Sequence, residues 1–472
     1  MNLLASIRSI GKHSYQPDLR SLAFMRIALA LVILTDLCIR LTDFTAHYTD
    51  AGVWPKEMLS QGWKTGYWTF HTLFAHSAYL AFLFICHLLL AISFLIGAYT
   101  RLSTFLLLVF YISLHNRNIF ILQAGDDLLR LTLLSCLFLP VGARYSVDVM
   151  RNKARSAIPV LAFPAYLLLI SSVYIFSVLL KDGPDWRINY DAVYYALNLS
   201  QLRLPLGDWL LQQQALLQPL TLLVLGLEAS IPILILWPAK SGRTRLLALL
   251  LILLLQFAFG LTLFVGLFWL ISIACSLALL PASAAERIEK FAHLPRQSSL
   301  PATTNRGIIN LLCLFLATLS LAVNLSTLRN FSYEISNPLI EVVNALRLDQ
   351  FWGMFSPGVL RKDGYLVYHG MDAIGRQWDL RRDEDYVDYQ EPAHIVDLHR
   401  NDRWRKWTEN MQDDRFTFLR PLYCQYTIRQ FNAKAKKRKV QLLKLYWVQK
   451  ETQPSYQPAI RKEILYCICN ED

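Results

Sequence analysis

Long apolar runs fill the first two-thirds of the chain, and most are long enough to cross a bilayer. A membrane-spanning helix needs roughly 20 mainly apolar residues to cross a hydrocarbon core about 30 Å thick. A helix over the uncharged stretch 246–280 would rise roughly 50 Å, so we break it near 260–266. The fourth apolar run is short, so the number of spans stays open between eight and ten. The candidate spans are 22–41, 76–97, 102–122, 127–140, 158–180, 215–237, 246–263, 266–280 and 308–325.

The last third of the chain has a different pattern, with charged residues throughout. Alternating apolar and polar residues predict strands at 364–369 and 440–449, the second pairing with 462–468, whereas 415–432 is more typical of a helix. The predicted fold class is therefore an all-α polytopic transmembrane bundle of about nine helices at 1–329. A small α+β domain follows at 330–472.

Composition and charge agree with a membrane protein and give it an orientation. Of the 472 residues, 54% are hydrophobic and 17% charged. Cytoplasmic loops of membrane proteins are enriched in Lys and Arg, and the basic residues here fall on alternate connections. We therefore predict a multi-pass protein of the cell membrane with a cytoplasmic amino terminus and an extracytoplasmic carboxyl-terminal domain. The clusters are Arg8, Lys12 and Arg20; Arg101; Arg144, Arg151, Lys153 and Arg155; Lys240, Arg243 and Arg245; and Arg287, Lys290, Arg296 and Arg306.

This topology also explains the formal net charge of +12, so the expected partner is the lipid bilayer and not a nucleic acid. The first apolar run ends at Arg40 without a small-residue cleavage site, which favours a retained span. The loop at 42–75 is rich in aromatic residues, as expected at the headgroup level. No cysteine spacing indicates a metal site. Whether Cys424, Cys467 and Cys469 form a disulfide stays open.

Charged residues within spans are costly and usually face protein or a watery cavity. Asp36 and Arg40 lie four residues apart, which predicts an ion pair on one helix face. Arg130 is likewise within reach of Asp126 and Asp127 at the start of the fourth span. For Asp36 and Arg40 we favour a structural role. For the cluster of Arg130 with Asp126 and Asp127, a structural role and a functional role are equally open.

Two further charges have more than one interpretation. Glu228 has no partner on its own span, so it either takes up a proton or pairs with another helix. Lys181 ends the fifth span, where periodicity alone favours a lysine that extends to the headgroups. A lysine desolvated by lipid and aromatic neighbours can instead lose its charge and accept a proton.

Four separated segments carry a resemblance to the HTTM domain family, the bacterial relatives of the vitamin K-dependent gamma-carboxylase, and together they cover most of the chain. They are 48–55 (YTDAGVWP); 113–130, with Asn116, Arg117, Asn118, Gly125 and Asp126; 181–197, with Lys181, Gly183, Trp186, Ala192, Tyr195 and Ala196; and 350–357 (QFWGMFSP).

The resemblance implies a site at the outer face of the membrane. In the carboxylase, a lysine five residues before a tryptophan deprotonates the reduced quinone cofactor, and Lys181 before Trp186 matches it. The resemblance thus implies that Lys181 is a base and that Asn116, Arg117, Asp126 and Trp186 bind substrate. Arg117 stands where the carboxylase has a histidine. Since arginine stays protonated, it can bind an anion but cannot shuttle a proton.

The leading hypothesis is a membrane enzyme, a lyase or oxidoreductase, that uses a lysine base on a quinol-like or other lipid-soluble acidic substrate. A reduced quinone cofactor is implied by the resemblance alone. Because Arg117 stands where the carboxylase has a histidine, the hypothesis does not specify carboxylation as the reaction. The alternative is a non-enzymatic membrane module that binds a lipid or protein partner through its outer domain. A transporter ranks last, because paired broken helices in matching halves are not visible.

Overall fold

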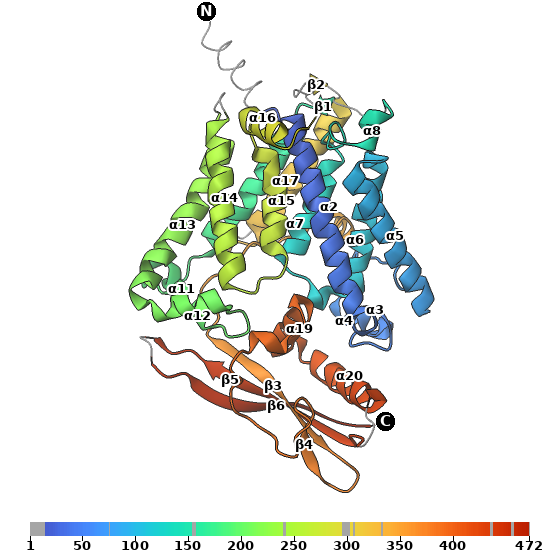
Figure 1. Cartoon of the computed structure of the whole chain (residues 1–472), viewed down its shortest axis with the longest axis vertical. Helices are drawn as coiled ribbons and strands as arrows, with labels where there is room; N and C mark the ends of the chain where they lie inside the picture. Colours follow the sequence, from blue (N-terminus) through green and yellow to red (C-terminus); the bar gives the residue numbers. More distant parts are fainter. Residues whose placement is uncertain are drawn as a thin grey trace, which may run out of the picture.

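The computed structural model shows a bundle of long helices joined at one end to a domain built around a sheet (Figure 1). It describes residues 15–74, 76–152, 157–238, 242–294, 303–304, 307–331, 334–434, 438–454 and 457–471. The longer helices of the bundle are α2 (Leu19–Thr42), α5 (Ser77–Ile96), α6 (Thr100–Arg117), α7 (Ala124–Cys136), α9 (Ala162–Leu180), α13 (Gln214–Leu236), α14 (Arg243–Thr262), α15 (Phe268–Ser276), α16 (Ala282–Phe291) and α17 (Gly307–Ser326).

Short elements connect these helices. They are α3 (Phe44–Tyr48), α4 (Leu59–Gly62), α8 (Val147–Met150), α10 (Pro184–Arg187), α11 (Ala192–Asn198), α12 (Pro205–Gln212) and the parallel pair β1 (Ile158–Pro159) and β2 (Thr303–Thr304). The predicted break in 246–280 falls between α14 and α15, where Gly266 has a positive φ of 58°.

Among the described residues, six helices are long and apolar enough to cross a membrane: α2, α5, α9, α13, α14 and α17. A seventh is obtained if the pair Phe268–Leu279 and Ala282–Phe291, bent by 108°, counts as one span. The predicted count of about nine is therefore not confirmed. Helix α7 has 13 residues and rises about 20 Å, and α15 has only 9 residues. The 18-residue α6 ends in polar residues that are buried.

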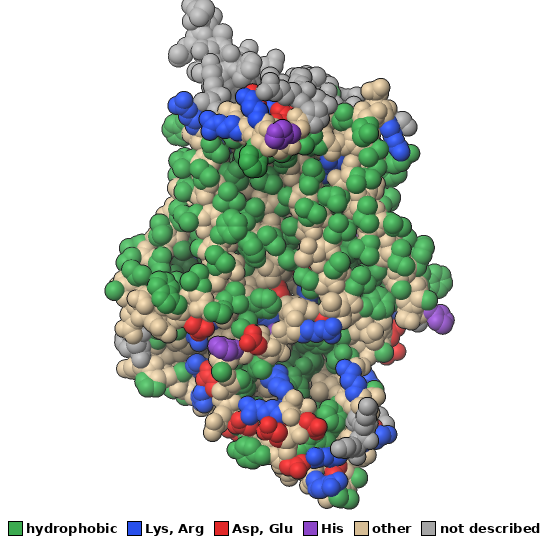
Figure 2. All heavy atoms as spheres, viewed as in Figure 1, with side chains coloured by type: hydrophobic (Ala, Val, Ile, Leu, Met, Phe, Trp, Pro, Cys, Tyr) green, Lys and Arg blue, Asp and Glu red, His purple; other side chains and the backbone are tan. Residues whose placement is uncertain are grey.

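The outer surface of the bundle is apolar, as a lipid-facing surface requires. Figure 2 shows hydrophobic side chains covering most of one face of the helices, with charged side chains beyond both ends of this region. Phe82, Leu89 and Leu254 are each more than half exposed on this surface. Apolar side chains on this scale indicate a lipid bilayer environment rather than water.

Several basic residues used to predict the orientation lie at the end of the bundle away from the sheet. Helix α16, which carries Arg287 and Lys290, and helix α8, which precedes Arg151, lie at that end (Figure 1). This arrangement is compatible with the predicted topology. Arg8, Lys12, Lys153, Arg155, Lys240, Arg296 and Arg306 lie outside the described residues.

The carboxyl-terminal domain contains an antiparallel sheet in the order β4-β3-β5-β6. Gly364 pairs with Gln449, which also pairs with Lys462, so the predicted strands and their pairing are confirmed. The predicted helical stretch at 415–432 corresponds largely to α20. The strands are β3 (Lys362–Met371), β4 (Gln377–Asp379), β5 (Leu442–Glu451) and β6 (Ile460–Asn470), and the helices are α18 (Asn337–Ala345), α19 (Asp402–Gln412) and α20 (Leu419–Lys434).

Helix α19 lies between the sheet and the bundle (Figure 1). Asn401 caps its first turn by accepting hydrogen bonds from the backbone N–H groups of Arg403 and Trp404. This cap fixes the start of α19 close to the bundle, where Arg403 donates a hydrogen bond to the carbonyl of Ile121 at 2.9 Å. The domain is therefore attached to the membrane helices by buried polar contacts.

Candidate functional site

Lys181 immediately follows the last residue of α9 and is buried within the protein. Helix α9 ends there because Gly183 and Pro184 follow, and the proline begins α10 at its first position. The Lys181 side chain turns back along α9, so that Nζ donates to Ser177 Oγ at 2.8 Å. Only 2% of Lys181 is exposed. The interpretation of a lysine that extends to the headgroups is therefore wrong.

The counter-ion of Lys181 is Glu228, which lies on the neighbouring helix α13. Nζ is 2.6 Å from Oε1 and 2.5 Å from Oε2, and only 4% of Glu228 is exposed. The Trp186 ring centroid lies 4.8 Å from Nζ, a distance that allows a cation–π interaction. Glu228 therefore has a partner outside its own helix, which is one of the two alternatives expected for a carboxylate within a span.

An apolar cavity of about 130 Å³ adjoins this ion pair. Lys181, Glu228 and Trp186 line it, together with apolar side chains from α11 to α14 that include Leu197, Leu210, Val224 and Phe259. A cavity of about 150 Å³ in another protein accepts benzene. The space beside Lys181 is slightly smaller than that, which is close to the size of one small ring.

A few other polar groups face the cavity. Gln256 is 1% exposed, and its Nε2 donates to the Tyr174 hydroxyl at 3.4 Å. Its Oε1 has no hydrogen-bond partner among the described residues. A buried acceptor without a partner is costly, so it marks a position where a ligand hydroxyl can donate a hydrogen bond.

The segment 352–361 closes the cavity and is held to the turn after α9. Trp186 Nε1 donates to the carbonyl of Phe355 at 2.8 Å, and the Gly183 N–H donates to that of Pro357 at 2.9 Å. Asp185 accepts from the Arg361 guanidinium at 2.9 Å. Two of the segments that carry the family resemblance, 181–197 and 350–357, are therefore in direct contact.

The other two segments contact each other elsewhere. Arg117, on α6, donates to the carbonyl of Trp54 at 2.8 Å and forms an ion pair with Asp50 at 3.3 Å. The Asn116 side-chain amide donates to the carbonyl of Trp68 at 2.7 Å and its oxygen accepts from Arg347. Neither Arg117 nor Asn116 is among the described residues that line the Lys181 cavity.

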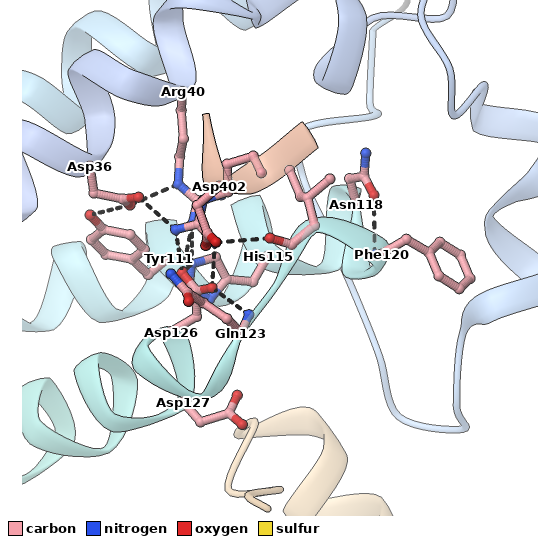
Figure 3. A network of polar contacts seen from close by, with 12 residues as sticks. Asp36, Arg40, Tyr111, His115, Asn118, Phe120, Gln123, Asp126, Asp127 and Asp402 are labelled. Carbon is pink, nitrogen blue, oxygen red and sulfur yellow. Dashed lines mark hydrogen bonds and ion pairs between the residues drawn. The ribbon is translucent and has the colours of Figure 1, made fainter. Parts of the chain in front are cut away.

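Asp126 belongs to a third arrangement, a buried network of two carboxylates and two guanidinium groups. It accepts from Arg40 at 2.7 Å and from Arg403 at 2.5 Å and 2.9 Å. Asp36 accepts from Arg40 at 2.7 Å, which confirms the predicted pair, and from Arg403 at 2.7 Å. Figure 3 shows Asp36, Arg40 and Asp126 converging. Arg130 contacts only one of its predicted partners, Asp127 at 2.5 Å.

His115 lies inside this network between two arginines. Its Nδ1 is 2.7 Å from Arg130 Nη1, and its Nε2 is 3.2 Å from Arg40 Nη2. Nε2 also lies 3.4 Å from Asp126 Oδ1. His115 is therefore committed to neighbouring side chains.

Of the predicted site residues, the structure brings Lys181 and Trp186 into one cavity and places Asn116, Arg117 and Asp126 outside its lining. Sequence reasoning singled out both Glu228 and Lys181 but did not pair them, and it missed Gln256 and Tyr174 altogether. Gln256 is the one polar side chain in the apolar run of α14, which is the signal that points to it.

Comparisons of the chain with models of protein families, with curated proteins and with solved structures found no match. The class that the fold defines is a helical membrane protein with a small antiparallel sheet domain.

Proposed function

We propose that this protein is a membrane enzyme in which Lys181 acts as a base on a lipid-soluble substrate with an acidic hydroxyl group, such as a quinol. The observation that carries the proposal is the buried amine at the wall of an apolar cavity, held by Glu228. The matching position of Lys181 and Trp186 in the carboxylase family supports it further. Arg117 is not needed for this site.

The contacts of Lys181 determine which proton transfers the proposed reaction requires. A lysine paired with a carboxylate is an ammonium ion and cannot accept a proton. For Lys181 to act as a base, one proton must first move from Nζ to a Glu228 oxygen, 2.5 or 2.6 Å away. The amine then takes the proton of the substrate hydroxyl, and the new ammonium faces the substrate oxyanion. In a quinol, the second hydroxyl donates to Gln256 Oε1 and orients the ring, so that the first hydroxyl is free to give its proton to Lys181.

The first experiment identifies small molecules that copurify with the protein by mass spectrometry. We expect a phenolic or quinone-type lipid to copurify with the wild type, and its turnover to fall by about 10²–10⁴-fold in Lys181→Ala and Lys181→Arg. Both variants should still insert into membranes. Full turnover in either variant would contradict the proposal.

A pair of variants on one helix tests the cavity itself. Val224 lines the cavity, whereas Leu223 beside it is half exposed on the outer surface. Val224→Trp should fill the space and abolish copurification, and Leu223→Trp should leave the bound molecule in place. Equal retention of the small molecule by both variants would place its site elsewhere.

A second candidate function is favoured by one contact pattern. All three N–H donors of Lys181 are used by Ser177 and Glu228, as a purely structural lysine would require. In that case the protein is a non-enzymatic membrane module that binds a lipid or a protein through its outer domain. Purification with a stoichiometric protein partner and without a lipid-soluble small molecule would support this second function.

A further inference from the structure

A second and larger hollow lies in the carboxyl-terminal domain. It has a volume of about 400 Å³ and is lined by residues of β3, α19, α20 and the segment before α19. Pockets for small organic ligands commonly have volumes of about 300–1,000 Å³. This pocket, which we call the aromatic pocket, is therefore large enough for a small organic molecule.

Aromatic rings form most of its wall. The Trp404 ring centroid lies 6.0 Å from that of Tyr423 and 5.9 Å from that of Tyr426. Tyr368 continues the row, 6.4 Å from Tyr423, and Phe431 also lines the pocket. Each of these side chains is partly exposed and lines the pocket, so a flat apolar molecule in the pocket would contact their rings.

The charges of the aromatic pocket are all positive. Its charged lining residues are Arg381, Arg400 and Lys434. Arg400 is paired with Asp43 at 2.9 Å. The Arg381 guanidinium lies 5.0 Å from the Tyr368 ring centroid and has no carboxylate partner in the described part of the chain. Its side-chain hydrogen bond to the carbonyl of Leu366 is long, at 3.5 Å.

Arg381 differs in this respect from nearby arginines in the same domain. Arg376 pairs with Asp372 at 2.8 Å, and Arg382, the next residue, pairs with Asp388 at 2.5 Å. A guanidinium group offers a planar fork that fits a carboxylate with two parallel hydrogen bonds. Arg381 is therefore a cation available to a ligand at the edge of an aromatic wall.

A neutral histidine completes the lining. Burial, together with the nearby cations Arg405 and Arg381, lowers the pKa of His399 to about 3. No hydrogen-bond partner is found for the His399 ring among the described residues. At neutral pH the ring therefore offers one N–H donor and one acceptor without adding a competing charge.

We infer that the aromatic pocket binds a planar aromatic carboxylate, whose carboxylate pairs with Arg381 and whose ring lies among Trp404, Tyr423 and Tyr426. The Arg381 guanidinium offers a planar fork to a carboxylate, and the rings of Trp404, Tyr423 and Tyr426 match a flat hydrocarbon body. This site is separate from the Lys181 cavity, so it stands whether or not Lys181 is a base.

The test uses the full-length protein in lipid nanodiscs and 2-naphthoate as the probe, titrated by calorimetry with empty nanodiscs as the blank. We expect saturable binding that becomes at least tenfold weaker in Arg381→Gln. The matched control Arg382→Gln, which changes the adjacent arginine, should bind 2-naphthoate like the wild type. Absence of saturable binding to the wild type, or equal binding by Arg381→Gln, would overturn the inference.

Two further probes test separately whether binding needs the carboxylate and whether it needs the aromatic ring. Neutral 2-naphthamide keeps the ring and should bind at least tenfold more weakly than 2-naphthoate, because it lacks the carboxylate. Octanoate keeps the carboxylate and should also bind at least tenfold more weakly, because it cannot stack. If either probe binds as tightly as 2-naphthoate, the assignment of an aromatic carboxylate is wrong.

Discussion

At the scale of single residues, Gly183 shows how closely two distant segments meet at the candidate site. A Cβ atom at this position would lie 2.5 Å from the carbonyl oxygen of Pro357 and 2.9 Å from its carbon. Backbone atoms cannot move aside as the end of a flexible side chain can. The absence of a side chain at Gly183 is therefore what allows 352–361 to cover the Lys181 cavity.

We predict that Gly183→Ala lowers the free energy of unfolding by about 1–3 kcal/mol, because overpacking forces the two segments apart. Thermal unfolding in detergent measures the change. Gly226→Ala is the control, since a Cβ there meets nothing within 4 Å and alanine favours a helix. Equal loss of stability in both variants would show that the contact with Pro357 is not responsible.

The sequence predicts contacts within one helix better than contacts between helices. Asp36 and Arg40 were paired correctly because a spacing of four residues places both on one helix face. The partner of Glu228 lies 47 residues away, and the pairing depends on how α9 packs on α13. For the same reason, the separation of Arg117 and Asp126 from the Lys181 cavity is not visible in the sequence.

At the scale of elements, one side chain of α19 joins the outer domain to two helices of the bundle. Arg403 is 4% exposed and contacts both Asp36 on α2 and Asp126 on α7. These two carboxylates are balanced by Arg403 and Arg40 together. Without Arg403, one buried negative charge would remain uncompensated.

Arg403→Ala should therefore destabilise the protein by about 3–5 kcal/mol, the usual effect of breaking a buried ion pair on one side. Unfolding should begin with release of the outer domain, detectable as faster proteolysis within 330–472. Arg415→Ala removes an exposed pair with Asp413 and should change stability by less than about 1 kcal/mol. Proteolysis of Arg403→Ala at the wild-type rate would refute this role of α19.

The element types were largely predictable, and the exceptions have physical causes. The paired strands of the outer domain follow from their alternation, and six spans follow from apolar runs of sufficient length. Helices α7 and α15 are too short to cross alone. Both helices pack inside the bundle, so their side chains must be apolar although the helices are shorter than a span. A count of spans from hydropathy alone therefore comes out too high.

At the scale of the whole molecule, the predicted orientation follows from basic residues and can be tested directly. Met150 and Ile374 are 83% and 74% exposed. Met150 is the last residue of α8, at the end of the bundle away from the sheet, and Ile374 lies between β3 and β4. The two residues therefore report on opposite sides of the membrane.

We predict that a membrane-impermeant maleimide labels Ile374→Cys in intact cells. Met150→Cys should be labelled only after the cells are permeabilised, because the positive-inside bias places that end in the cytoplasm. The unmodified chain, with its eight cysteines, gives the background. The opposite labelling pattern would reverse the orientation and place the Lys181 cavity at the inner face.

The contacts of Arg403 also have a consequence for how the protein is made. Asp36 and Asp126 are synthesised long before Arg403, which lies 277 residues after Asp126. Until the chain is nearly complete, the membrane helices hold two acidic groups with only Arg40 between them, and they lack the cation that balances the second. Chains that terminate before Arg403 would therefore keep a buried carboxylate without its cation, which is strongly destabilising.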